Sequence, residues 1–143
     1  MTGVQTCALP ISWSELGADA KAVRTSVFVY EQAVSPEDEW DAMDAECLHF
    51  VARDRAGNAI GTARLLPDGH IGRMAVLRAF RGQGIGDALL KSAIDSARQA
   101  GHSQAILNAQ LTALGFYQRH GFQAYGPVFD DAGIDHKAMK LIL

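Results

Sequence analysis

The sequence has few cysteines, no excess of one charge and no long apolar run. Its two cysteines, Cys7 and Cys47, are too few for a disulfide framework, and no His or Cys cluster has the spacing of a zinc site. Thirteen Lys and Arg against sixteen Asp and Glu give a net charge of −3, which argues against a general nucleic-acid or anionic-membrane binder. No apolar run approaches the roughly 18 residues that a membrane span needs. These absences predict a cytoplasmic protein without a metal, nucleic-acid or membrane partner.

The residues that are present suit a single folded domain. Hydrophobic residues make up 48% of the chain and charged residues 20%, so 143 residues can bury a sizeable core without cross-links. The first twelve residues stand apart, because they follow no clear period and match an in-frame translation of a common sequencing-adapter strand from a GTG start. We therefore expect a non-native leader over 1–12, in place of a native first strand, and one domain over 13–143.

Hydrophobic periodicity predicts a mixture of strands and helices. Helical spacing covers 13–32, and a polar, acidic loop follows over 33–46. Alternation and turn residues predict three antiparallel strands at 47–54, 59–66 and 70–77. The remaining predicted elements are a glycine-rich turn at 78–86, a helix at 87–100, a strand at 103–109, a helix at 111–120 and closing strands at 123–128 and 136–143.

One segment, Arg81 to Gly86, has the composition of an anion site. Its sequence, Arg-Gly-Gln-Gly-Ile-Gly, lies between a predicted strand and a predicted helix. The glycines leave backbone N–H groups uncovered, and the helix start and Arg81 add positive charge, so phosphate or pyrophosphate is the expected ligand. Two other phosphate loops do not fit. A dinucleotide fingerprint would need glycine at Leu89, and a Walker loop would need Gly-Lys-Ser/Thr.

Two separate motifs resemble those of the GNAT-type N-acetyltransferase superfamily. Arg81-x-x-Gly84-x-Gly86 matches the family's acetyl-CoA loop, and Ala113 to Phe122 resembles its later A-x-x-F-Y-x-x-x-G-F motif. The resemblance covers about 13–143. It implies the GNAT acyl-CoA N-acyltransferase fold, an α/β (α+β) arrangement of a mainly antiparallel, twisted sheet with about four flanking helices. The sheet would have six or seven strands and split between strands four and five.

The flanking segments resemble the ElaA-like branch of that superfamily. Arg24 to Gln32 is similar to the branch's R-x-x-V-F-V-x-E-Q helix end. Asp131 to Met139 is similar to its closing D-G-I-x-H-x-x-M segment, here with Ala132 inserted. Asn108 stands where relatives often carry His on the fifth strand.

The resemblance also implies how acetyl-CoA, the expected co-substrate, is held. The loop from Arg81 to Gly86 would cradle the pyrophosphate, while backbone groups of Met74, Ala75 and Val76 would pair with the pantetheine arm like an added strand. A backbone N–H near Val76 would polarise the thioester carbonyl. The implied binding residues are Met74, Ala75, Val76, Arg81, Gly82, Gln83, Gly84, Ile85, Gly86, Asn108 and Tyr117.

Direct transfer needs an unprotonated amine and a proton for the departing thiolate. By resemblance Tyr117 is the acid, because its hydroxyl would point at the coenzyme sulfur and an ordinary tyrosine pKa of roughly 10 keeps it protonated. The base stays open among Glu31, Asp44, His49, His70 and His136, and a water chain could replace any of them. Glu31, near the expected acceptor site, is the first to test. Cys47 is the only candidate nucleophile for a covalent route, and no base neighbours it in sequence.

The resemblance therefore implies an acetyl-CoA-dependent N-acetyltransferase that acts on a primary amine, more in keeping with a small molecule than with a protein tail. Two alternatives stay open: a catalytically idle acyl-CoA-binding sensor, and an interaction domain whose glycine loop binds nothing. The acidic stretch 37–46 is either a solvated face or attracts a cationic acceptor. The identity of the acceptor, the acyl chain and the choice between monomer and homodimer stay open.

Overall fold

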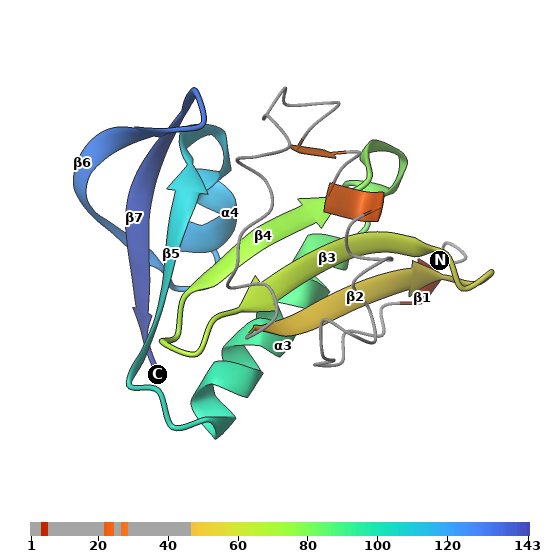
Figure 1. Ribbon diagram of the computed structural model, residues 1–143, viewed down its shortest axis with the longest axis horizontal. Helices are drawn as coiled ribbons and strands as arrows, with labels where there is room; N and C mark the ends of the chain where they lie inside the picture. Colours follow the sequence, from red (N-terminus) through yellow and green to blue (C-terminus); the bar gives the residue numbers. More distant parts are fainter. Residues whose placement is uncertain (1–3, 6–21, 25–26, 29–46) are drawn as a thin grey trace.

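The computed structural model describes residues 4–5, 22–24, 27–28 and 47–143 (Figure 1). Its strands are β1 (Val4–Gln5), β2 (Leu48–Asp54), β3 (Ala59–Leu65), β4 (Ile71–Val76), β5 (Gln104–Gln110), β6 (Gln123–Asp131) and β7 (Ile134–Ile142). Its helices are α3 (Ile85–Gln99) and α4 (Leu114–Gln118), with short 3-10 helices η3 (Arg78–Phe80) and η4 (Leu111–Ala113). Residues 22–24 and 27–28 are helical, within the predicted first helix. The predicted acidic loop lies outside the described residues.

The strands form two antiparallel sheets that meet at a bridge. The first sheet has the order β1-β2-β3-β4 and the second β5-β7-β6. A parallel bridge between His70 and Ile106 joins the start of β4 to β5, and the Ile106 N–H donates to the Gly69 carbonyl at 3.2 Å. Beyond this bridge the two strands diverge (Figure 1). The predicted split between the fourth and fifth strands is therefore confirmed.

Turn chemistry sets the register of the β2–β3 hairpin. The Gly57 N–H donates to the Asp54 carbonyl at 3.0 Å, and the Asn58 N–H donates to Asp54 Oδ1 at 2.9 Å. This backbone hydrogen bond from Asn58 is the main reason why the pKa of Asp54 lies below its ordinary value. The hairpin lies where the alternating pattern predicts it, with strand ends that differ by one residue.

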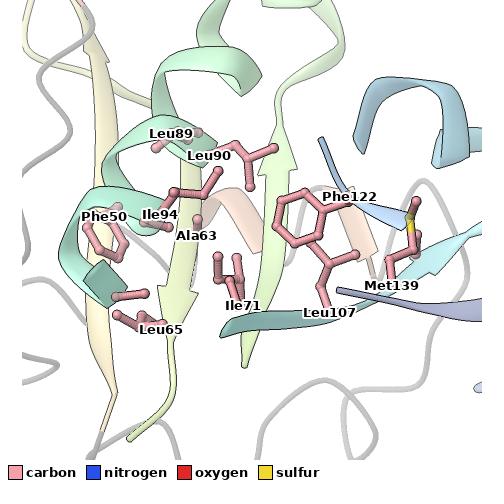
Figure 2. Close-up of a cluster of buried hydrophobic side chains, with 14 of the residues drawn as sticks. Phe50, Ala63, Leu65, Ile71, Leu89, Leu90, Ile94, Leu107, Phe122 and Met139 are labelled. Carbon is pink, nitrogen blue, oxygen red and sulfur yellow. The ribbon is translucent and has the colours of Figure 1, made fainter. Parts of the chain in front are cut away.

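Helix α3 packs one face into a core that both sheets share (Figure 2). Its buried residues include the predicted apolar stripe: Leu89, Leu90, Ala93, Ile94 and Ala97. Gly61 on β3 lets the helix approach closely, since a Cβ there would lie 3.0 Å from Leu89 Cδ1 and 3.1 Å from Ile85 Cγ2. Gly61 also pairs with Val76 at the end of β4. The start of α3 is thus held beside the open end of the divergence between β4 and β5.

Several boundaries differ from those predicted. Helix α3 begins at Ile85, two residues early, because Gly84 is its left-handed N-cap (φ 80) and accepts the Ala88 N–H at 3.1 Å. The predicted helix at 111–120 is divided into η4 and α4. Strands β6 and β7 extend further toward each other, because Ala132 (φ 53) and Gly133 (φ 82) close a two-residue turn between them.

Strand β1 lies in the segment predicted to be an adapter-derived leader. Val4 pairs with Asp54 and Gln5 with Arg53, so this segment occupies the edge beside β2. Ladder hydrogen bonds use backbone groups, and such an edge accepts sequences of many kinds. The origin of residues 1–12 stays a prediction. Sequencing of the source locus after adapter removal tests it, and finding the same codons within the genome would refute it.

Candidate active site

A cavity of about 810 Å³ opens where β4 and β5 diverge. Its walls include the helical residues 27–28, β3, β4, the loop before α3, the start of α3, β5, α4 and the facing ends of β6 and β7. Ligand cavities commonly measure about 300–1,000 Å³, so this one has room for an extended small molecule.

The loop before α3 presents bare backbone to this cavity. Gly82 (φ 79) and Gly84 (φ 80) line it, and a Cβ at either would meet nothing within 4 Å. Ile85 turns its side chain into the core, where it meets Gly61. The first N–H groups of a helix have no intrahelical partner and carry the positive end of the helix dipole. This end of the cavity is therefore suited to bind an anion.

Two arginines add positive charge at the same end. The Arg81 Nε donates to the Val76 carbonyl at 3.0 Å, which ties the glycine loop to the end of β4. The Arg119 guanidinium lies 5.6 Å from the centroid of the Phe116 ring. Both side chains line the cavity, where guanidinium groups can bind an anion by charge-assisted hydrogen bonds.

A carboxylate at the start of α3 is paired with an imidazole of the α4 segment. Asp87 Oδ1 lies 2.7 Å from His120 Nε2, and the His120 side chain is only 10% exposed. Phe116 packs against His120 and against Gly86, which precedes Asp87: the Phe116 and His120 ring centroids are 5.3 Å apart, and a Cβ on Gly86 would lie 3.4 Å from Phe116 Cζ. The pair and the ring hold α4 against the N-terminus of α3.

Strand β4 offers its outer edge to the cavity. Thr62 pairs with Ala75 and Arg64 with Gly72, so β4 has one residue more than β3 in this interval, which is a β-bulge. On the other side, the described strands meet β4 only at the His70–Ile106 bridge. The backbone groups of residues 74–76 can therefore pair with an extended ligand.

Tyr117 reaches from α4 to β4. Its hydroxyl lies 4.0 Å from the Met74 Sδ, and its ring packs edge-on against Phe116 and Phe122. Burial raises the pKa of Tyr117 to about 12. The hydroxyl is therefore protonated at neutral pH and lies at the divergence of the two sheets.

A polar surface faces the cavity from the second sheet. Gln110 pairs with His136 in the β5–β7 register, so both side chains lie on one face of the sheet with Asn108. The other face carries Leu107 and Met139, which are buried in the core. All three polar residues line the cavity. An acceptor that enters from this side meets hydrogen-bonding groups.

His70, at the closed end of the divergence, is tied to its own turn. Its Nδ1 lies 2.9 Å from Asp68 Oδ1. Burial alone would raise the pKa of Asp68, but hydrogen bonds from the backbone and side chain of His70 lower it overall. His70 thus lines the cavity at the closed end of the divergence, beside the Asp68 carboxylate.

The cavity brings together the described binding candidates except one. Gln83 is exposed and does not line it. Of the candidate bases, His70 and His136 line the cavity, whereas His49 is buried in β2 away from it. Glu31 and Asp44 lie outside the described residues. Cys47 is buried and does not line the cavity either.

Sequence reasoning missed several residues of the cavity wall. Arg64 is 6% exposed and is the only charged residue in Ala59–Leu65. A charged residue within such an apolar strand indicates a candidate functional residue, so the sequence did contain a signal for it. The contact between Asp87 and His120 spans 33 residues and leaves no local pattern.

The described ranges, 4–5, 22–24, 27–28 and 47–143, contain neither a metal-binding cluster nor a membrane-spanning helix. No group of three or more His, Cys, Asp or Glu is placed there to hold a metal ion. No helix there is long and apolar enough to cross a membrane.

The chain is similar to known proteins in both sequence and structure. The family model described as "Acetyltransferase (GNAT) domain" matches residues 16–143. "Uncharacterized N-acetyltransferase YjcF" of Bacillus subtilis (strain 168) is 38% identical over 125 residues, covering 85% of this chain and 89% of the relative. A solved acyl-CoA N-acyltransferase from Pseudomonas aeruginosa is 31% identical, with a TM-score of 0.80 over 96% of this chain and 98% of that chain. Escherichia coli ElaA is 26% identical, with a TM-score of 0.81 and coverage of 96% and 98%.

The matched segment contains the features that build the cavity. It includes the glycine loop, both diverging strands and α4, so the comparison and the geometry agree. The predicted family, fold and enzyme class are confirmed. The chain belongs to the GNAT acetyltransferase family, whose N-acyltransferases use an acyl-CoA co-substrate.

Proposed function

We propose that this chain is a cytoplasmic enzyme that transfers an acetyl group from acetyl-CoA directly to the primary amine of a small molecule. The observation that carries the proposal is the cavity at the split sheet, with an anion-binding loop at one end and a polar surface on another side. The Tyr117 hydroxyl lies between these two regions, beside Met74. A diphosphate-bearing thioester and a polar amine can therefore reach one place from different sides.

The described residues suit the parts of acetyl-CoA. We assign the diphosphate to the loop Arg81–Gly86, where bare backbone, a helix start and a guanidinium converge. The pantetheine arm would pair with the outer edge of Met74–Val76, beside the β-bulge between Gly72 and Ala75, and a backbone N–H near Val76 would polarise the thioester carbonyl. Asn108 on β5 faces this arm across the divergence.

Tyr117 is the proposed acid. Its hydroxyl stays protonated at neutral pH and can donate to the sulfur as negative charge develops there. Positioned acids of this kind contribute about 10²–10⁴-fold to a rate. The base predicted from the sequence, Glu31, lies outside the described residues and stays a prediction.

The transfer is proposed to be direct because no cysteine among the described residues lines the cavity. Among the residues that the structure describes, Cys47 is the one cysteine. It is buried and does not line the cavity. An acyl-enzyme on that sulfur would need acetyl-CoA to reach the interior of the first sheet.

Binding and turnover are tested separately. Acetyl-CoA at 100 times its Kd should stabilise the protein by about 2.7 kcal/mol, and calorimetry should give one site. Thiol release is then measured with amino acids, polyamines and arylalkylamines, using acetyl-CoA and succinyl-CoA to identify the acyl chain. Absence of stabilisation would refute the proposal. Stabilisation without thiol release from any amine would instead establish the acyl-CoA sensor.

A further inference from the structure

The ring of His136 is held in one orientation. Its Nδ1 lies 2.7 Å from the Ile134 carbonyl oxygen, two residues earlier on the same strand. The ring stacks on Phe129 of β6, with centroids 5.9 Å apart and an interplanar angle of 25°. The residue is 9% exposed and lines the cavity. These contacts determine which edge of the imidazole faces its own backbone.

This orientation determines the tautomer of the neutral ring. A carbonyl oxygen only accepts hydrogen bonds, so His136 Nδ1 must carry the hydrogen. The lone pair of the neutral ring then lies on Nε2, on the edge of the ring away from the β7 backbone. No described residue hydrogen-bonds to Nε2. His136 therefore offers a proton-accepting nitrogen to the cavity.

His136 and Tyr117 lie at about the same distance from the bridge at which β4 and β5 begin to diverge. From the bridge between His70 and Ile106, Met74 and Gln110 are each four residues further along their strands, or about 13 Å. The Tyr117 hydroxyl lies 4.0 Å from the Met74 Sδ. Gln110 is the register partner of His136, and such partners have Cα atoms roughly 5 Å apart.

The two side chains come from opposite faces of the split sheet. Tyr117 packs against Phe122, which belongs to the core with Met139. Met139 and His136 are an odd number of residues apart on β7, so their side chains lie on opposite faces. A carbonyl between β4 and β5 would therefore have the phenol on one side and the imidazole on the other.

We infer that His136 is the general base that removes a proton from the acceptor amine, an assignment that rests on the proposed function. Its Nε2 takes a proton from the acceptor ammonium and later releases it to solvent. The amine lone pair forms the C–N bond, and the C–S bond electrons leave with the sulfur. Tyr117 donates its hydroxyl proton to that sulfur and recovers a proton from the nitrogen of the new amide. The sum is one amide, one thiol and one proton.

Other ionisable groups also line this side of the cavity. His70 lies at the closed end of the divergence, beside the Asp68 carboxylate. Arg64 from β3 and Asp131 from β6 also line the cavity. The charges of Arg64 and Asp131 lie at the cavity where the proton is transferred, so the pH profile is compared between variants rather than interpreted alone.

The decisive variant is His136→Asn. Its amide nitrogen can still donate to the Ile134 carbonyl, but it places no basic nitrogen at the Nε2 position. With 2-phenylethylamine, an ammonium ion at neutral pH, kcat should fall by about 10² or more. With hydroxylamine, which is already unprotonated, kcat should stay close to wild type. The rate of the variant with 2-phenylethylamine should keep rising with pH where that of wild type levels off.

Three further measurements separate this inference from the proposed function. Calorimetry should give His136→Asn the wild-type affinity for acetyl-CoA. His102→Asn, on a half-buried histidine that does not line the cavity, should leave both rates unchanged. Nitrogen NMR of the wild-type protein with acetyl-CoA should show the hydrogen of neutral His136 on Nδ1. A hydrogen on Nε2, or wild-type turnover of 2-phenylethylamine by His136→Asn below neutral pH, would overturn the assignment even if acetyl-CoA binds and reacts.

Discussion

Replacing Tyr117 with Phe removes one hydroxyl and leaves the packed ring. The ring keeps its contacts with Phe116 and Phe122, and the hydroxyl loses only a long contact to the Met74 sulfur at 4.0 Å. We therefore expect the free energy of unfolding at neutral pH to change by less than about 1 kcal/mol. Turnover should fall by about 10²–10⁴-fold, because the sulfur leaves without its proton donor. The Kd for acetyl-CoA should stay close to wild type.

The same substitution has a signature in alkaline solution. The pKa of Tyr117 is about 12 in the folded chain, against 10.0 for an ordinary tyrosine. Between these values the unfolded chain loses the proton while the folded chain keeps it, so stability falls as the pH rises. Two pKa units correspond to about 3 kcal/mol. Across this range, Tyr117→Phe should gain about 3 kcal/mol of stability relative to wild type.

Denaturant unfolding and thiol release measure the two effects. Tyr125→Phe is the matched control, because this ring is 42% exposed and lies beside Lys140 rather than in the cavity. It should change neither the turnover nor the alkaline stability. Wild-type turnover by Tyr117→Phe would refute the acid assignment. An unchanged stability difference between neutral pH and pH 12 would refute the burial argument for its pKa.

Three other predictions follow from the geometry. Gly84→Ala and its control Gly57→Ala each place a Cβ on left-handed backbone, so each should lower the free energy of unfolding by about 1 kcal/mol, measured with denaturant. Only Gly84→Ala should weaken the binding of acetyl-CoA, measured by calorimetry. Equal affinities would contradict the loop assignment. Ala132→Asn should raise the free energy of unfolding by about 0.5–1 kcal/mol, because asparagine tolerates the positive φ of this turn better, and a lower value would count against it. His120→Ala should raise the KM for acetyl-CoA, because it removes the contact with Asp87. His120→Gln can still reach Asp87, so its KM should lie between those of wild type and His120→Ala. Equal KM values for His120→Ala and wild type would exclude a positioning role for His120.

The sequence alone determined most of the elements and one end of the site. The apolar stripe of α3 and the alternation of β2 and β3 are local patterns, and the structure follows them within one or two residues. The glycine loop could also be predicted, because uncovered N–H groups at a helix start need only neighbouring residues to form. The sequence did not identify Ile85 as the first residue of the helix, since Gly84 acts as N-cap only in its left-handed conformation.

The tertiary structure decided what faces the glycine loop. His136 and Tyr117 come from β7 and α4, and they meet at one height only because β7 lies between β5 and β6 and because β4 and β5 part beyond one bridge. The sequence left five candidate bases open, with Glu31 the first to test. Of the two described candidates that line the cavity, His70 and His136, His136 is the one whose Nδ1 contacts a backbone carbonyl, that of Ile134. Local periodicity specifies which face of a strand is buried, but register and strand order, set by the packing of the whole core, specify which polar groups share a cavity.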